Sequence, residues 1–71
     1  MLNNGLADFA VFVNYTGTDH KNWNTLKAFN CHSLAEALGL AILNIKSNDN
    51  DAIIHKYMVI NVTDATAPVG V

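Results

Sequence analysis

The stretch SLAEALGLAILNIKS, residues 33–47, decides the fold, because its pattern is that of one amphipathic helix. Ser33 is a favourable N-cap, and Glu36 completes an S-x-x-E capping box in which each side chain can accept a hydrogen bond from an unpaired backbone N–H. Apolar residues then recur at helical spacing in a single stripe: Leu34, Ala37, Leu38, Ala41, Ile42 and Ile45. Lys46 lies in the last turn, where the helix dipole favours a cation, and a polar run at 47–51 follows. We predict a helix from Ser33 to about Ser47 whose stripe faces a sheet.

Upstream of the helix, apolar residues alternate with a period of two from Asp8, as in a strand. One face of this strand carries Phe9, Val11, Val13 and Tyr15, and the other carries Ala10, Phe12 and Asn14. A polar loop at 16–22 predicts a hairpin connection. The second strand, from Trp23 to Asn30, alternates less cleanly, and we expect a bulge that moves Leu26 or Phe29 onto the core face.

A closing strand is predicted from about Ile53 to Thr63. One face would carry Ile54, Met58, Ile60 and Val62, interrupted by Lys56, and the other His55, Tyr57, Val59 and Asn61. Residues 1–7 are expected to be a loose start, and residues 64–71 an extended or frayed tail. The predicted fold class is α+β, a β-β-α-β chain with a three-stranded, mainly antiparallel sheet and one helix on one face. It forms one domain, 1–71, with an ordered core at about 8–63.

The composition predicts a marginal core and an apolar surface. A chain of 71 residues buries only about 60% of its unfolded surface. Half of the residues are apolar (51%) and 14% are charged, against roughly 25% charged in an average soluble domain. This excess fits a domain whose apolar surface continues into an interface.

The charge pattern argues against direct nucleic-acid binding. The net charge is −2, and all four cations are lysines, so no arginine is present for bidentate phosphate or guanine contacts. The start of the chain does not resemble a signal peptide, and the longest apolar segment, Leu34–Ile45, is too short to span a bilayer. A lone cysteine, Cys31, suits a reducing compartment, so we expect a cytoplasmic protein with no membrane partner.

Two sets of residues contain side chains that are typical of metal or catalytic sites. Cys31 and His32 are adjacent, and neighbours in an extended segment point to opposite faces, so one metal ion could not easily take both. His32 is also the only sequence-local base for a Cys31 nucleophile. The Asp49/Asp51 turn lacks the glycine and the glutamate of a calcium loop. We therefore expect no catalytic residue, no metal site and no cofactor.

The candidate residues for a partner interface are apolar side chains with no predicted cover. Leu40 and Leu43 fall on the helix opposite its apolar stripe. If the helix covers the sheet face carrying Ile54, then Tyr57 and Val59 lie on the other face. The orientation of the first strand decides whether Phe12 or the row Phe9, Val11, Val13 and Tyr15 lies beside them. Scattered exposed apolar residues are also normal in soluble proteins. The marginal core and the low charge favour an interface.

The six residues SLAEAL at 33–38 open a helix that follows a hairpin and precedes a final strand. In this the chain resembles small phage-encoded β-β-α-β proteins, such as the host RNA-polymerase inhibitor of T7-like phages and some anti-CRISPR proteins. The architectural resemblance covers about residues 8–63, and the sequence resemblance covers only 33–38. The chain differs from the polymerase inhibitor in having no arginine, so no functional residue is carried over.

This resemblance implies a small protein that occupies a surface of a larger one. We expect a non-enzymatic protein-binding module that inhibits or modulates a larger host complex, acting in the host cytoplasm if it is phage-encoded. The alternative is a structural or assembly domain that acts through homo-oligomerisation, with a homodimer as the simplest form.

Overall fold

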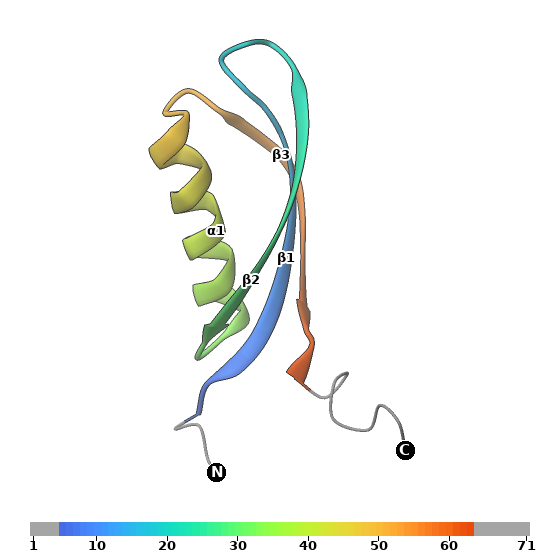
Figure 1. Cartoon of the computed structure of the whole chain (residues 1–71), viewed down its shortest axis with the longest axis vertical. Coiled ribbons are helices and arrows are strands. Elements are labelled where there is room, and N and C mark those ends of the chain that lie inside the picture. The colour runs from blue at the N-terminus through green and yellow to red at the C-terminus, as the bar shows by residue number, and fades with distance from the viewer. Residues whose placement is uncertain (1–4, 64–71) are drawn as a thin grey trace.

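The computed structural model describes residues 5–63, which form a three-stranded sheet with one helix lying along one side of it (Figure 1). The elements in chain order are β1 (Ala7–Thr16), β2 (Asn22–Cys31), α1 (Leu34–Asn48) and β3 (Ile53–Asn61). The strand order is β2-β1-β3, and β1 runs antiparallel to both neighbours. The predicted α+β class and β-β-α-β order are confirmed. The expectation of loose ends falls largely on residues 1–4 and 64–71, outside the described range.

Local capping defines where α1 begins. Ser33 is extended (φ −156°), and its Oγ accepts a hydrogen bond of 3.1 Å from the backbone N–H of Glu36, as the capping box predicts. The Glu36 carboxylate reaches one residue further back than in the usual box, because its Oε1 accepts from the N–H of His32 at 2.9 Å. At the other end, the N–H of Asp49 donates to the Ile45 carbonyl at 2.9 Å. The predicted helix is confirmed to within about one residue at each end.

The irregularity in the sheet lies in β3, and the bulge expected in β2 is wrong. The β1–β2 register runs without interruption from Ala7 opposite Cys31 to Thr16 opposite Asn22. On the other side of β1, Lys56 pairs with Asn14 and Ile54 pairs with Tyr15, so His55 is an extra residue.

The bulge at His55 changes which side chains of β3 share a face. It places Ile54 on the helix side, packed against the core, while Met58 and Ile60 point away from the helix. The prediction that Ile54, Met58 and Ile60 share one face is therefore wrong, because one inserted residue reverses the alternation of a strand.

The core lies between α1 and the inward face of β1 and is small. Its buried members are Phe9, Val11, Val13, Cys31, Ala37, Ala41, Ile45 and Ala52. Val11 and Val13 are the largest side chains that are completely buried. In the predicted apolar stripe of the helix, Leu34 in the first turn is half exposed. The buried residues of α1, which make its contact with the sheet, are Ala37, Ala41 and Ile45.

Candidate functional site

An uncovered apolar surface occupies the face of the sheet turned away from α1. Successive residues of a strand point to opposite faces, so Phe12 points outward between the buried Val11 and Val13. The residues opposite Phe12 are Leu26 on β2 and Met58 on β3, and those opposite Ala10 are Ala28 and Ile60. Directly opposed residues share a face. We call this surface the open face: Ala10, Phe12, Leu26, Ala28, Met58 and Ile60.

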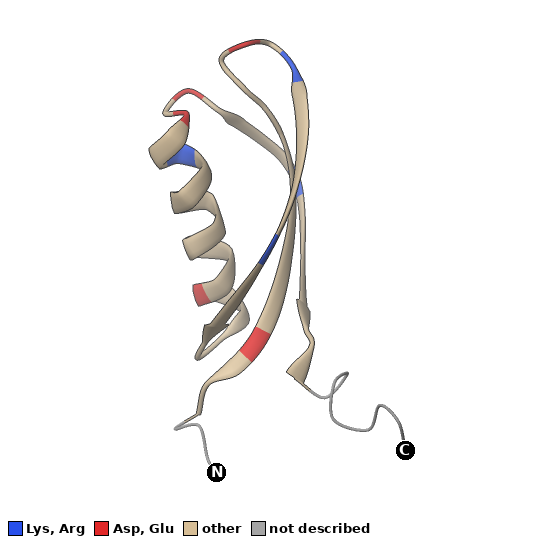
Figure 2. Ribbon diagram, viewed as in Figure 1, with Lys and Arg blue, Asp and Glu red and all other residues tan. Residues whose placement is uncertain are grey.

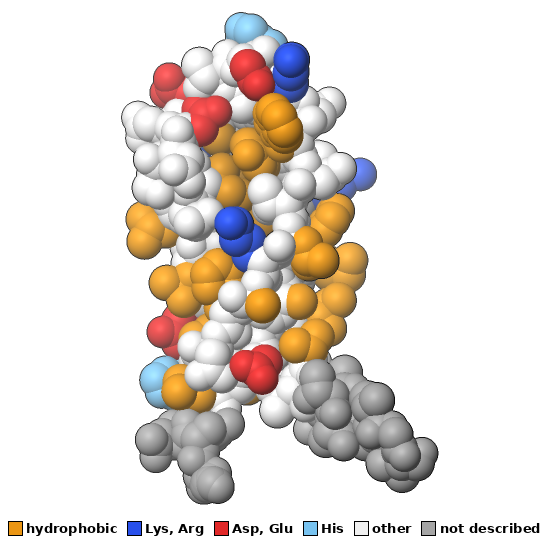
Figure 3. All heavy atoms as spheres, in the orientation of Figure 1, with side chains coloured by type: hydrophobic (Ala, Val, Ile, Leu, Met, Phe, Trp, Pro, Cys, Tyr) orange, Lys and Arg blue, Asp and Glu red, His pale blue; other side chains and the backbone are white. Residues whose placement is uncertain are grey.

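The large side chains of the open face are in water. Leu26 is 70% exposed, Met58 and Ile60 are about half exposed, and Phe12, at the centre of the sheet, is 38% exposed. Hydrophobic side chains gather on the right of the molecule in Figure 3, on the side of the sheet opposite the helix. Single exposed apolar residues are normal, but four in register across three strands form a contiguous patch.

Polar side chains border the open face at both ends and hydrogen-bond to one another along the rows of the sheet. At one end, the Asn14 amide donates to Asn24 Oδ1 at 2.8 Å. In the next row, the Thr16 hydroxyl donates to Asn22 Oδ1 at 2.8 Å.

The other end of the open face is bordered in the same way. There the Asn30 amide donates to Asp8 Oδ1 at 2.8 Å. An apolar centre with a polar rim is the usual anatomy of a protein–protein interface.

The five interface residues predicted from the sequence lie in three different places. Phe12 is on the open face. Tyr57 and Val59 are on the helix side of β3, where Val59 packs against the core and Tyr57 stays exposed at the sheet edge. Leu40 and Leu43 line a groove of about 450 Å³ with Phe29, Asn44 and Ser47, between α1 and β2.

Sequence reasoning missed three of the four large side chains of the open face: Leu26, Met58 and Ile60. The alternation of residues 23–30 contained the signal for Leu26, which a regular strand places with Phe12. Met58 and Ile60 were assigned to the covered face with Ile54, and no local pattern marks the bulge that separates them.

Cys31 and His32 lie in different surroundings. The Cys31 thiol is buried under the helix, and its Sγ contacts the Ser33 carbonyl oxygen at 3.6 Å. The His32 ring is exposed, with Nδ1 3.4 Å from Glu36 Oε1. Each side chain thus has its own local partner at the entrance to the helix.

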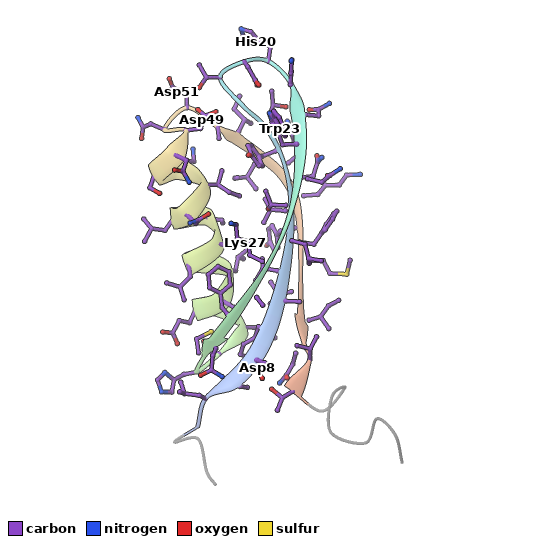
Figure 4. The ribbon with its side chains drawn as sticks, viewed as in Figure 1. Asp8, His20, Trp23, Lys27, Asp49 and Asp51 are labelled. Atoms are coloured by element: carbon purple, nitrogen blue, oxygen red, sulfur yellow. The ribbon has the colours of Figure 1, made fainter. Side chains whose placement is uncertain are left out.

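Asp49, at the C-terminal end of α1, accepts hydrogen bonds from the hairpin loop. Its Oδ2 accepts from the Thr18 N–H at 2.8 Å, and its Oδ1 accepts from the Thr18 hydroxyl. These bonds, with a smaller contribution from Lys46, hold the pKa of Asp49 below its ordinary value. Asp49 and Asp51 lie side by side at this end of the molecule (Figure 4). Within residues 5–63, no three His, Cys, Asp or Glu side chains are grouped to hold a metal ion.

Gly17 lets the loop approach this contact. A Cβ at position 17 would lie 2.8 Å from Asp19 Oδ1 and 2.9 Å from Asp49 Oδ2, closer than such atoms approach. The two loops at this end of the molecule carry Asp19, Asp49 and Asp51 together with Lys21, and Lys46 lies in the adjoining last turn of α1, so charges of both signs meet here (Figure 2).

In the part of the chain that the structure describes, α1 is too short to cross a membrane. Comparisons with protein-family models, curated proteins and solved structures find no match to this chain.

Proposed function

We propose that the protein is a non-enzymatic protein-binding module whose docking surface is the open face. The observation that carries this proposal is the alignment of Leu26, Phe12 and Met58 in one row across three strands, with Ile60 beside them. The backbone that carries these side chains is already ordered in a hydrogen-bonded sheet, so a partner that covers them does not have to order a loop. Phenylalanine and methionine are also enriched at the centres of interfaces.

The small core supports the same proposal. Only eight residues among 5–63 form the buried cluster, and most of them are alanine or valine. A chain of this length gains stability when a further apolar surface is buried, at about 25 cal/mol for each Å² removed from water. Covering the open face therefore stabilises the fold while it forms a complex.

The test is site-specific photo-crosslinking in the cells that naturally contain the protein. A benzophenone amino acid replaces Leu26 on the open face or, as control, Asn50 in the turn after α1; both positions are exposed. We expect an ultraviolet-dependent covalent adduct with a polypeptide from position 26 and none from position 50. The mass of the adduct reports the partner, so a larger protein, which the phage resemblance implies, is detected in the same measurement. Absence of any adduct from position 26 contradicts the proposal.

A further inference from the structure

We propose that the polypeptide covering the open face is a second copy of this chain, related by a two-fold axis that crosses the strands. The two sheets then pack face to face, and each contact occurs twice. This inference rests on the proposed function, since it names the partner of the same surface. It is carried by two patterns on the face, one of side-chain size and one of charge.

The size pattern is self-complementary. The open face has a row of large residues, Leu26, Phe12 and Met58, next to a row that contains the two alanines, Ala28 and Ala10, and ends with Ile60. A two-fold axis between the rows places Phe12 against the partner's Ala10 and Leu26 against the partner's Ala28. At these two positions a large side chain then fits over a small one, as close packing between two sheets requires, while Met58 meets the partner's Ile60 at the edge of the face.

The charge pattern selects the same axis. Lys56 pairs with Asn14 in the row beyond Phe12, and Asp8 lies in the row beyond Ala10, so the cation and the carboxylate border opposite ends of the face. Figure 4 shows Asp8 at the start of β1, far from the hairpin loop. The two-fold axis exchanges these ends, so Lys56 approaches the partner's Asp8, one strand away.

An axis parallel to the strands gives a poorer match. It would place Phe12 over the partner's Phe12 and Asp8 over the partner's Asp8. Two carboxylates would then face each other, and like charges in direct opposition are destabilising. Both patterns therefore favour the axis that crosses the strands.

The size of the face predicts a weak dimer. Three strands about 4.8 Å apart, each about 34 Å long, give a sheet surface of roughly 500 Å² on each copy, made up of the open face and its polar borders. Two such surfaces bury about 1,000 Å², below the roughly 1,200 Å² at which stable interfaces begin and in the range of weak, transient ones. We expect a dissociation constant of roughly 10 to 100 μM, so the monomer and the dimer interconvert.

Sedimentation velocity of the full chain, from about 1 μM to about 1 mM, tests self-association and its location. The wild type should shift from monomer to dimer across this range. Leu26→Lys should weaken the dimer at least tenfold, because it places a lysine in the row of large apolar side chains of each copy. Leu43→Lys is the matched control: its side chain, 64% exposed, lines the groove beside α1, so the dimer should match the wild type. A wild type that stays monomeric at 1 mM, or two lysine variants with equal effects, overturns the inference.

Charge reversal tests the axis. Asp8→Lys and Lys56→Asp should each weaken self-association about tenfold, since each places like charges at two symmetric contacts. An equimolar mixture of the two single variants should dimerise as the wild type does, because every contact in the mixed dimer again joins opposite charges. Circular dichroism checks that each variant is folded. If the mixture associates no better than the single variants, the axis is wrong.

The photo-crosslinking outcomes separate this inference from the proposed function. An adduct at twice the monomer mass, identified as two copies by mass spectrometry, supports both. An adduct with a different protein only overturns the second copy as the partner and leaves the docking surface in place. No adduct overturns both.

Discussion

Both faces of β1 carry apolar side chains, but α1 buries only one of the two faces. Val11 and Phe12 are neighbours in the sequence, yet Val11 is completely buried under α1 while Phe12 is 38% exposed. One helix about 10 Å wide can cover only one face of a three-stranded sheet. The chain therefore has one apolar face that forms the core with α1 and a second that stays exposed.

The largest effect should come from a charge on the covered face. Val11→Asp would bury a carboxylate among apolar side chains, with no cation among the buried residues near it. An unpaired buried charge costs several kcal/mol, a large share of the 5–15 kcal/mol that stabilises a typical domain. We expect an unfolded or molten chain, measured as loss of the cooperative thermal transition in circular dichroism. A variant with the same thermal transition as the wild type would show that Val11 is not buried under α1.

Removing the N-cap of α1 should destabilise the helix that covers the inner face of β1. Ser33→Ala deletes the hydrogen bond to the Glu36 N–H and should cost about 1 kcal/mol, lowering Tm by about 4–8 °C in a chain of this size. Ser47→Ala is the control, because that hydroxyl donates to the Asn44 carbonyl at the exposed end of α1 and caps no free N–H. Equal losses in the two variants would contradict the role of the cap.

The Asp49 contact at the far end of α1 should make stability depend on pH. The lowered pKa means that the carboxylate form is favoured by folding, so its contribution is present above the ordinary value of 3.8 and is lost as the pH falls through the folded-state pKa. Asp49→Asn should lower Tm at pH 7, and the difference from the wild type should shrink as the pH falls below 3.8. Asp51→Asn, which leaves the Thr18 contacts intact, should not reproduce this pH dependence. A difference that is constant with pH would exclude the ionised carboxylate as its cause.

The smallest effect on the monomer should come from the open face. Leu26→Lys replaces a side chain that is already in water, so the free energy of unfolding should change by no more than about 0.5 kcal/mol at concentrations where only monomer is present. Urea denaturation at a few micromolar measures it. A loss as large as that of Ser33→Ala would show that the open face contributes to monomer stability.

The helix and the first strand were predictable because their signals are local. A capping box with one apolar stripe defines α1, and strict alternation defines the two faces of β1. The candidate site was only partly predictable. Phe12 was identified, but Leu26, Met58 and Ile60 depend on strand register, and Val59 packs against the core.

The sequence by itself determined the order of elements, the helix bounds and the surplus of apolar residues, because propensity, capping and periodicity act over a few neighbouring residues. Only the tertiary structure decided which sheet face the helix covers and where β3 changes register. The bulge at His55 is a property of two paired strands, because it exists only in the register of β3 along β1. Because one extra residue exchanges the two faces of a strand, this long-range pairing, and no local pattern, placed Met58 and Ile60 beside Phe12 on the open face.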